Sequence, residues 1–348
     1  MNMNKINFKM RRVIVPLLVI CVLALYIFFR QWSVQPATLE NTSASMLVRA
    51  KHLHERSYEI YFNRFEEQTF SQEIVRHGHD IMKKSDVVLF GMLNEAYIPF
   101  TYSWLCNTKP MGIHASVLLL TMDTNSTDLL KRDWPEVHTI HLAVGDFKGD
   151  QEYSKAGYVK MMNLRTQAIN LLLRNKIPLL LFETDCLWIH NPIPEIVQAV
   201  KNHDILVVKP THKHGYLGGF MCLMPEETTL KVWGKLSERM YKLHNSLTNL
   251  KDKETVADET NDQVFFSTIV EQEKKIKLYE FSNKKIVDGK WYIDFTEKDR
   301  REMKPLIINN NWVRGNKKKI ARAKKWGHWF VSKSLKCNIT QVNRIVEL

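Results

Sequence analysis

The sequence of 348 residues lacks low-complexity segments and internal repeats, and no Gly/Ser-rich linker follows residue 84. Because 45% of its residues are hydrophobic and aromatic side chains are spread along its length, the composition excludes an intrinsically disordered protein. Its 5 cysteines include no Cys-x-x-Cys pair and no Cys/His metal spacing. The length corresponds to one large domain or two smaller ones.

The N-terminal region contains an uninterrupted apolar run over residues 13–29, which follows four basic residues and is closed by Arg30. This run is near the lower limit for a membrane-spanning helix, which usually needs about 20 residues. A cleaved signal peptide is the alternative, but its apolar region is usually about 7 to 15 residues long and ends at a small-residue cleavage site. The segment "LYIFFRQWS" offers no such site, so the run predicts an uncleaved signal anchor.

Positive charge before the span predicts a cytoplasmic N-terminus and a lumenal remainder, the topology of a type II membrane protein. We expect a cytoplasmic tail at residues 1–12, a transmembrane signal anchor at 13–29 and a partly helical stem at 30–84. Glycosylation sequons begin at Asn41, Asn125 and Asn338, all beyond the span.

Four cysteines follow the span, at positions 106, 186, 222 and 337. In an oxidising lumen they can form two disulfides, for which three pairings are open. Buried free thiols are an equal alternative.

Positive charge is concentrated at two places in the chain, whose formal net charge is +13. The cytoplasmic tail carries four basic residues, and residues 314–336 carry nine with no acidic residue. A lumenal protein is separated from genomic DNA. The expected partners of this basic segment are therefore the phosphates of a small ligand, an acidic glycan or a lipid surface. A solvated helix face is the alternative.

From residue 86 the sequence alternates between short apolar runs and amphipathic segments. Runs at 86–93, 115–122, 138–144, 177–185, 204–210 and 216–224 predict buried strands, and segments at 94–108, 158–175 and 225–244 predict helices. Strands without polar alternation, each followed by a helix, favour a mostly parallel sheet with helices on both faces. We expect this α/β domain at residues 85–335, followed by a C-terminal tail at 336–348, with ligands beyond the carboxyl ends of the strands.

Two carboxylates, Glu183 and Asp185, follow the apolar run of the fourth predicted strand. Residues two apart on a strand point to one face, so the two acids converge and repel unless a cation lies between them. Oxygen ligands of this kind suit a divalent metal that phosphates and water also bind. An acid/base pair of a glycosidase and a capped strand end are the alternatives.

These carboxylates belong to a longer pattern, since "LLLFETDCLWIHNP" resembles the D-x-D-x-x-W-x-x-x-P segment of the nucleotide-diphospho-sugar transferase family. That family includes plant pectin xylosyltransferases and cell-wall arabinosyltransferases. Further segments resemble the family in the same order: "YVKMMNLRTQAINLLL", "LGGFMCLMPEETTLKVWGKL", "TNDQVFF" and "NNNWVRGNKKKIARAKKWGHW". Together the matches extend from about residue 87 to residue 330.

The resemblance implies a GT-A-like Rossmann-type fold and a role for particular residues. Asp185 would bind a metal, Mn²⁺ or Mg²⁺, and Glu183 would hold the ribose or the metal through water. The turn at Leu93 and Asn94 would touch the nucleoside, and Gly219 would allow close approach near the sugar. The remaining donor or acceptor contacts implied are Arg165, Asp262, Gln263, Asn309, Gly315 and Lys317, with Lys318, Lys319 and Arg322 near the diphosphate. For Asp262 an ordinary helix N-cap is an equal alternative.

The resemblance has three departures: Glu183 replaces the usual Asp, Leu217 an Asn, and Asn309 a His that could ligate the metal. With these departures, the sequence predicts a Golgi-type, membrane-anchored, metal-dependent glycosyltransferase. It would move a sugar from a UDP-linked donor to a glycan or glycoprotein, with retention of configuration. A catalytically inactive lumenal binding protein of the same fold is the alternative. A basic module for membrane surfaces or nucleic acid is a third reading, which the predicted topology opposes.

Overall fold

The computed structural model describes residues 57–144, 147–211 and 214–346. The predicted cytoplasmic tail and membrane span lie outside these residues, as does most of the predicted stem. Within the described ranges, no helix is both long and apolar enough to cross a membrane. The fold described below is that of the unit formed by residues 61–348.

A seven-stranded sheet forms the centre of this unit, with strand order β3-β2-β1-β4-β7-β6-β8. Only β7 runs against its two neighbours, β4 and β6, while the other pairs described are parallel. The predicted mostly parallel sheet is therefore confirmed. Its strands are β1 (Val88–Leu93), β2 (Val117–Thr121), β3 (His138–His141), β4 (Leu179–Leu181), β6 (Ile205–Val208), β7 (Met221–Leu223) and β8 (Leu278–Phe281).

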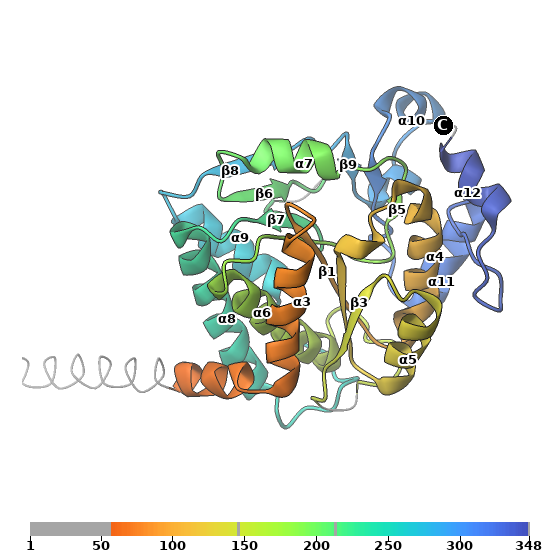
Figure 1. The fold of residues 1–348 in the computed structure, drawn as a ribbon. Helices are drawn as coiled ribbons and strands as arrows, with labels where there is room; N and C mark the ends of the chain where they lie inside the picture. Colours follow the sequence, from red (N-terminus) through yellow and green to blue (C-terminus); the bar gives the residue numbers. More distant parts are fainter. Residues whose placement is uncertain (1–56, 145–146, 212–213, 347–348) are drawn as a thin grey trace, which may run out of the picture. The chain divides into compact units, whose positions relative to one another are not determined.

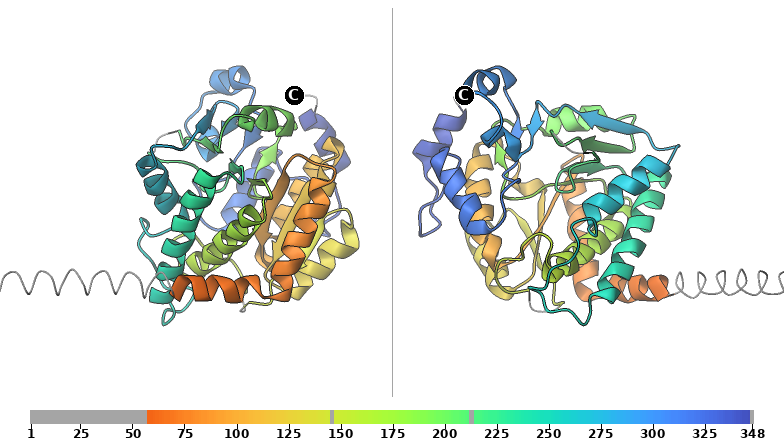
Figure 2. Two further views of the ribbon diagram at one scale, coloured as in Figure 1. Left: turned by 60° about the vertical axis from the view of Figure 1, so that its left-hand side comes forward. Right: turned by 180° about the vertical axis from the view of Figure 1, so that it is seen from behind.

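Helices cover both faces of the sheet. α3 and α6 lie on one side of the strands, and α4 and α5 lie on the other (Figure 1, Figure 2). The helix α6 also packs against α8, which in turn packs against α9. The longer helices are α3 (Thr69–Met82), α4 (Ile98–Thr108), α5 (Thr124–Asp133), α6 (Ala156–Arg174), α8 (Glu227–Ser246), α9 (Asp262–Gln272) and α11 (Asn316–Lys325); the shorter ones are α7 (Ile193–Val200), α10 (Glu297–Met303) and α12 (Ile339–Val346).

A second, three-stranded sheet brings the C-terminal region against the segment that follows β4. Its order is β5-β10-β9, with β5 at Leu187–Trp188, β9 at Ile286–Val287 and β10 at Ile307–Ile308. The antiparallel pair of β5 and β10 aligns Leu187 with Ile308. The residues after β10 therefore lie beside those before β5.

The predicted strand at 177–185 is shorter in the structure, and this changes the position of the two carboxylates. β4 ends at Leu181, because its pairing with β1 and β7 stops there. Glu183 and Asp185 lie in the turn that follows, where the Cys186 amide donates a hydrogen bond to the Glu183 carbonyl at 3.3 Å. The expectation that strand alternation aligns the two acids is therefore wrong.

The fold also extends beyond both predicted domain limits. α3 lies in the segment expected to be a stem, yet it packs against α6 and β3, and Ile74 and Ile81 are buried on it. α12 lies in the predicted C-terminal tail and packs against α4. Both helices therefore belong to the α/β unit.

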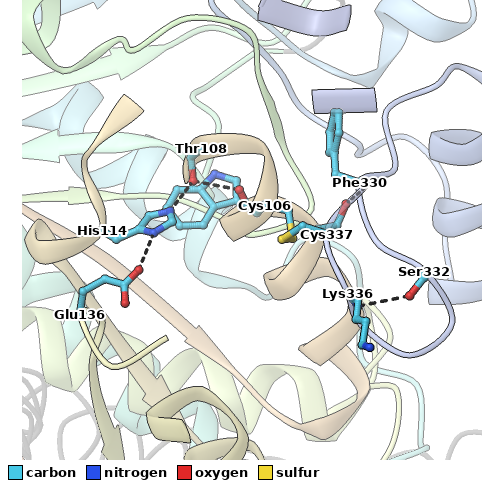
Figure 3. The surroundings of a disulfide bond; sticks show 10 residues. Cys106, Thr108, His114, Glu136, Phe330, Ser332, Lys336 and Cys337 are labelled. Carbon is cyan, nitrogen blue, oxygen red and sulfur yellow. Dashed lines mark hydrogen bonds and ion pairs between the residues drawn. A yellow bond between two sulfur atoms is a disulfide. The ribbon is translucent and has the colours of Figure 1, made fainter. Parts of the chain in front are cut away.

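A disulfide joins Cys106 on α4 to Cys337, just before α12, across a sequence separation of 231 residues (Figure 3). Nearby, the Phe330 amide donates to the Ser103 hydroxyl at 3.0 Å, which fastens the same segment to α4. Cys186 and Cys222 are buried free thiols. Each of the two alternatives left open by the sequence therefore holds for one pair of these four cysteines.

The double variant Cys106→Ala/Cys337→Ala is expected to lose about 2–4 kcal/mol of unfolding free energy, since the crosslink restricts the unfolded chain over a long loop. Urea unfolding followed by circular dichroism measures this loss. Reductant should lower the midpoint of the wild type and leave that of the double variant unchanged. Equal midpoints of oxidised wild type and double variant would contradict the expectation.

Candidate active site

A pocket of about 360 Å³ opens where β1 and β4 end. Tyr97, in the 3-10 turn after β1, and Glu183, in the turn after β4, both line it. Further lining comes from the residues before β7, the start of α9 and the segment between β10 and α11. Ligands of open α/β sheets bind beyond the carboxyl ends of the strands, so the pocket has the position expected of a substrate site.

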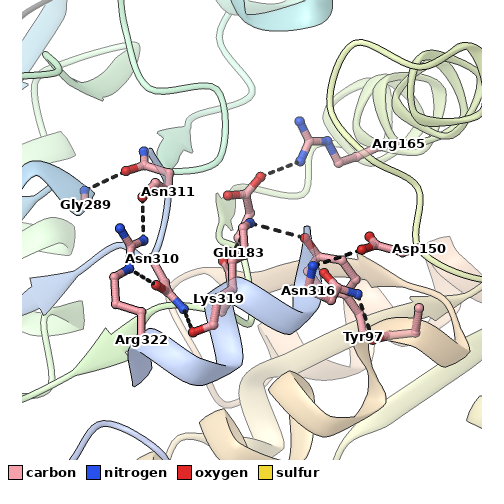
Figure 4. A network of polar contacts seen from close by, with 12 residues as sticks. Tyr97, Asp150, Arg165, Glu183, Gly289, Asn310, Asn311, Asn316, Lys319 and Arg322 are labelled. Atoms are coloured by element: carbon pink, nitrogen blue, oxygen red, sulfur yellow. Dashed lines mark hydrogen bonds and ion pairs between the residues drawn. The ribbon is translucent and has the colours of Figure 1, made fainter. Parts of the chain in front are cut away.

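Arg165 on α6 forms the centre of a buried ion network in the pocket wall. It is 5% exposed, and its guanidinium lies 2.5 Å from Asp262 Oδ2 and 3.7 Å from Glu183 Oε1 (Figure 4). It also donates to the Gly218 carbonyl at 3.4 Å. Burial alone lowers the pKa of Arg165, but the charge of Asp262 and its other neighbours outweighs this and raises the pKa. The guanidinium therefore stays charged and fixes both carboxylates.

Glu183 points into the pocket, with 32% of its side chain exposed and protein atoms around the rest. Burial, followed by the negative charge of Asp185, raises the pKa of Glu183. A Cβ atom on Gly219 would overlap this carboxylate. The glycine therefore permits the close approach of the segment before β7 to Glu183. The predicted close approach at Gly219 is thus present, and in the structure it accommodates Glu183.

Asp185 lies deeper than Glu183 and is almost fully enclosed, with 1% of its side chain exposed. Its Oδ2 accepts from Lys319 Nζ at 2.6 Å, while its Oδ1 is buried and has no hydrogen-bond partner among the described residues. Burial lowers the pKa of Lys319, but Asp185 and then Tyr97 outweigh this and raise it well above its usual value. Lys319 lines the pocket, and Asp185 does not.

Asn309, in the segment that follows β10, has a second buried side-chain oxygen. The residue is 3% exposed, and its Oδ1 has no hydrogen bond within the described part of the chain. The pairing of β5 with β10 brings its segment next to that of Asp185. Its neighbour Asn310 donates to the Lys319 carbonyl at 3.1 Å and accepts from Arg322 at 2.8 Å, which holds α11 in place.

These oxygens fit a divalent cation that shares its coordination with phosphate. Within the described ranges, there is no group of three or more His, Cys, Asp and Glu residues that could hold a metal ion by itself. Mg²⁺ and Mn²⁺ nevertheless commonly take one or two carboxylates and complete their shell with substrate phosphates and water. The unpartnered oxygens of Asp185 and Asn309, with the nearby Glu183, supply such a partial ligand set.

The start of α11 forms the pocket wall next to Lys319. Gly315 lines the pocket with a φ of 86°, a left-handed conformation that glycine adopts without strain. The Asn316 amide donates to Asp150 at 2.9 Å, and the Asn316 side chain donates to the Ala96 carbonyl at 3.0 Å. Lys317 is exposed and does not line the pocket, so Lys319 is the lysine of this helix at the candidate site.

The two residues after β1 that were predicted to contact the nucleoside are buried in the structure and do not line the pocket. Leu93 and Asn94 are each 1% exposed. Asn94 donates to the carbonyls of Phe147 and Gly149, both at 2.7 Å. It therefore fixes the segment that leads to the pocket residues at 150–153.

Asp262 and Gln263, which the resemblance implies as contacts of the donor sugar or acceptor, both line the pocket. The N-cap of α9 is Asn261, whose side-chain oxygen accepts from the Val264 amide at 3.0 Å. Asp262 is therefore not the N-cap, and its carboxylate is turned to Arg165. Gln263 accepts from the Gly218 amide at 3.2 Å and so joins α9 to the turn before β7.

Sequence reasoning missed the aromatic and rim residues of the pocket. Tyr97, Tyr153, Tyr158 and Trp312 line it, and in the sequence nothing separates them from core aromatics. Burial raises the pKa of Tyr97 to about 12, so its hydroxyl stays protonated. At the rim Arg314 forms an ion pair with Asp258 at 3.0 Å.

Comparison with known proteins identifies one family and several similar solved structures. The model of the family described as nucleotide-diphospho-sugar transferase matches residues 112–323. The chain is similar to the glycosyltransferase GlyE of Streptococcus pneumoniae TIGR4, with 13% identity and a TM-score of 0.42, covering 75% of this chain and 63% of that chain. It is also similar to mouse xyloside xylosyltransferase 1 in its apo form, with 11% identity and a TM-score of 0.37, covering 66% of this chain and 98% of that chain.

A third similar structure is galactosyltransferase LgtC in complex with donor and acceptor sugar analogues. It has 8% identity and a TM-score of 0.39, covering 68% of this chain and 95% of that chain. No curated protein matches the sequence.

Proposed function

The chain belongs to the nucleotide-diphospho-sugar transferase family, and we propose that it moves a sugar from a UDP-sugar to a glycan or glycoprotein with the help of a divalent cation. Membership makes it a nucleotide-sugar-dependent glycosyltransferase. The uridine base, the type of acceptor and the metal requirement are the parts that the proposal adds. The observation that carries it is the meeting of Arg165, Glu183, Asp262 and Lys319 in the wall of one pocket.

Charge is the main physical problem of sugar transfer. As the bond between sugar and diphosphate breaks, negative charge grows on the leaving phosphate and positive charge on the sugar ring. Preorganised charges at both places stabilise this transition state more than the bound substrate. Lys319 offers a positive charge to the diphosphate, and Asp262 offers a negative charge for the reacting sugar carbon.

Asp185, Glu183 and Asn309 are the residues that would hold the divalent cation. When bound, such a cation acts as a Lewis acid on the leaving phosphate. Arg165 lies within ion-pair distance of Glu183 and orients Asp262, and the hydrogen bond from the Gly218 amide orients Gln263 towards the same pocket. The resemblance to the family is the basis for proposing retention of configuration.

We assign the protein to the Golgi membrane as a single-pass type II protein. The predicted span at residues 13–29 and the basic residues before it support this. The disulfide between Cys106 and Cys337 is in keeping with an oxidising lumen. The plant-type pectin and cell-wall transferases named above remain the proposed subgroup.

A second candidate function is that of a catalytically inactive binding protein of the same fold. It is favoured by the replacement of the expected Asp and His by Glu183 and Asn309. Such a protein would bind UDP in the same pocket without turnover.

Donor turnover separates the two candidates. The purified protein is incubated with UDP-galactose, UDP-xylose and UDP-arabinose, and UDP release and transfer to a panel of glycans are measured. We expect turnover of at least one donor, which EDTA abolishes and Mn²⁺ restores. Calorimetric binding of UDP without any turnover would support the second candidate, and the absence of both would contradict the proposal.

A further inference from the structure

The ammonium group of Lys319 separates Asp185 from the pocket. Asp185 has a side chain only 1% exposed and lines no part of the pocket, whereas Lys319 is part of the wall. Nζ of Lys319 lies 2.6 Å from Oδ2 of Asp185. A cation that enters from the pocket therefore meets a positive charge before it reaches the carboxylate, and the second carboxylate oxygen stays buried and unpartnered among the described residues.

The backbone of Lys319 is held, but its side chain has a choice of partners. Asn310 fixes the Lys319 carbonyl, and the nearby Arg322 is engaged by Asn310 and by the Asn311 carbonyl. The ammonium lies 3.4 Å from the Tyr97 hydroxyl, at the edge of the pocket. A lysine is a compact charge on a flexible four-carbon chain, so it can change partners without movement of α11.

We propose that Lys319 is a nucleotide-operated gate on the metal site, an inference that rests on the proposed function. In the empty pocket the ammonium stays on Asp185 and opposes a divalent cation. A diphosphate that enters the pocket offers anionic oxygens to the ammonium, which turns towards them and releases Asp185. The freed Asp185 carboxylate would then be available to hold the cation, so metal and nucleotide would bind together.

This gate predicts opposite effects on the two ligands when the ammonium is removed. Mn²⁺ alone should bind more tightly, because Asp185 has lost its competitor. UDP alone should bind more weakly, because the diphosphate has lost a charged donor. A lysine with a purely structural role would weaken the binding of both when removed. Coupling between two ligands is reciprocal, so each must raise the affinity of the other by one factor in the wild type.

Titration calorimetry with Mn²⁺ and UDP, each alone and together, tests the gate in the wild type and in Lys319→Met. We expect Mn²⁺ affinity without UDP to rise by about tenfold in the variant. We expect UDP affinity without metal to fall by about tenfold, the value of a charged hydrogen bond. Lys325→Met removes the same charge from an exposed position of α11 and should change neither affinity.

Thermal melting provides a readout that does not depend on activity, because a ligand that binds the folded state stabilises it. Mn²⁺ without UDP should raise the melting temperature of Lys319→Met more than that of the wild type. If Lys319→Met does not fold, Lys319→Gln, which can still donate a hydrogen bond to Asp185, takes its place.

Two results would overturn the gate: Mn²⁺ binding to the wild type that is equally tight with and without UDP, or unchanged or weaker Mn²⁺ binding in the folded variant. Failure of the proposed function is distinct, because there the wild type would not bind UDP under any of these conditions.

Discussion

Asp185→Asn is expected to lower kcat for donor turnover by on the order of 10³-fold, because several kcal/mol of transition-state stabilisation depend on the cation it would hold. The change keeps the size of the side chain and removes its charge. Asp185 is enclosed, and its Oδ1 has no partner among the described residues, so the loss of charge affects the candidate metal position directly. Initial rates of UDP release measure the effect.

Asp128→Asn is the matched control, since it makes the same change at an exposed position of α5. It should keep wild-type turnover. Thermal melting of both variants separates lost chemistry from lost folding. Wild-type rates in a folded Asp185→Asn protein would refute the assignment of Asp185.

Arg165→Met is expected to lower the free energy of unfolding by about 3–5 kcal/mol, which is typical when one partner of a buried ion pair is removed. The guanidinium is 5% exposed and lies 2.5 Å from Asp262, so its loss leaves a buried carboxylate without a counter-charge. Chemical denaturation followed by tryptophan fluorescence measures the loss.

The double variant Arg165→Met/Asp262→Asn tests this explanation. Removing the second charge relieves the penalty, so the double variant should be more stable than Arg165→Met alone. If the two single effects simply add, the pair does not have the energetic role assigned to it.

The alternation of apolar runs and amphipathic segments correctly predicted the mostly parallel sheet, because strand and helix periods are local properties of the chain. It did not predict where β4 ends. That end depends on how many residues of β1 and β7 are available for pairing, and Leu181 is the last of β4 to find partners on both sides. Glu183 and Asp185 are therefore positioned by the turn that follows β4 and not by the strand itself.

For the site, too, the sequence identified some residues but did not predict their contacts. Arg165 and Asp262 were identified through the resemblance, but their ion pair joins residues 97 positions apart and no spacing rule predicts it. Lys317, Lys318 and Lys319 are equivalent in the sequence. Which of them reaches the pocket depends on the rotation of α11, and the contact of Asn310 with the Lys319 carbonyl fixes that rotation.

Leu93 and Asn94 were expected at the nucleoside because the resemblance to the family implied this role. The structure uses the buried amide of Asn94 to hold the 147–149 segment instead. Tyr97, three residues later, reaches the pocket. The residue that lines the pocket after β1 therefore depends on the short helical turn at Glu95–Tyr97.

The most direct measurement is a crystal structure of the purified protein with UDP and Mn²⁺. We predict nucleotide density in the pocket beside Tyr97, the diphosphate within hydrogen-bond distance of Lys319, and Mn²⁺ bound to Asp185. Nucleotide bound outside this pocket, or bound within it with Mn²⁺ held only by residues other than Asp185, would contradict the account.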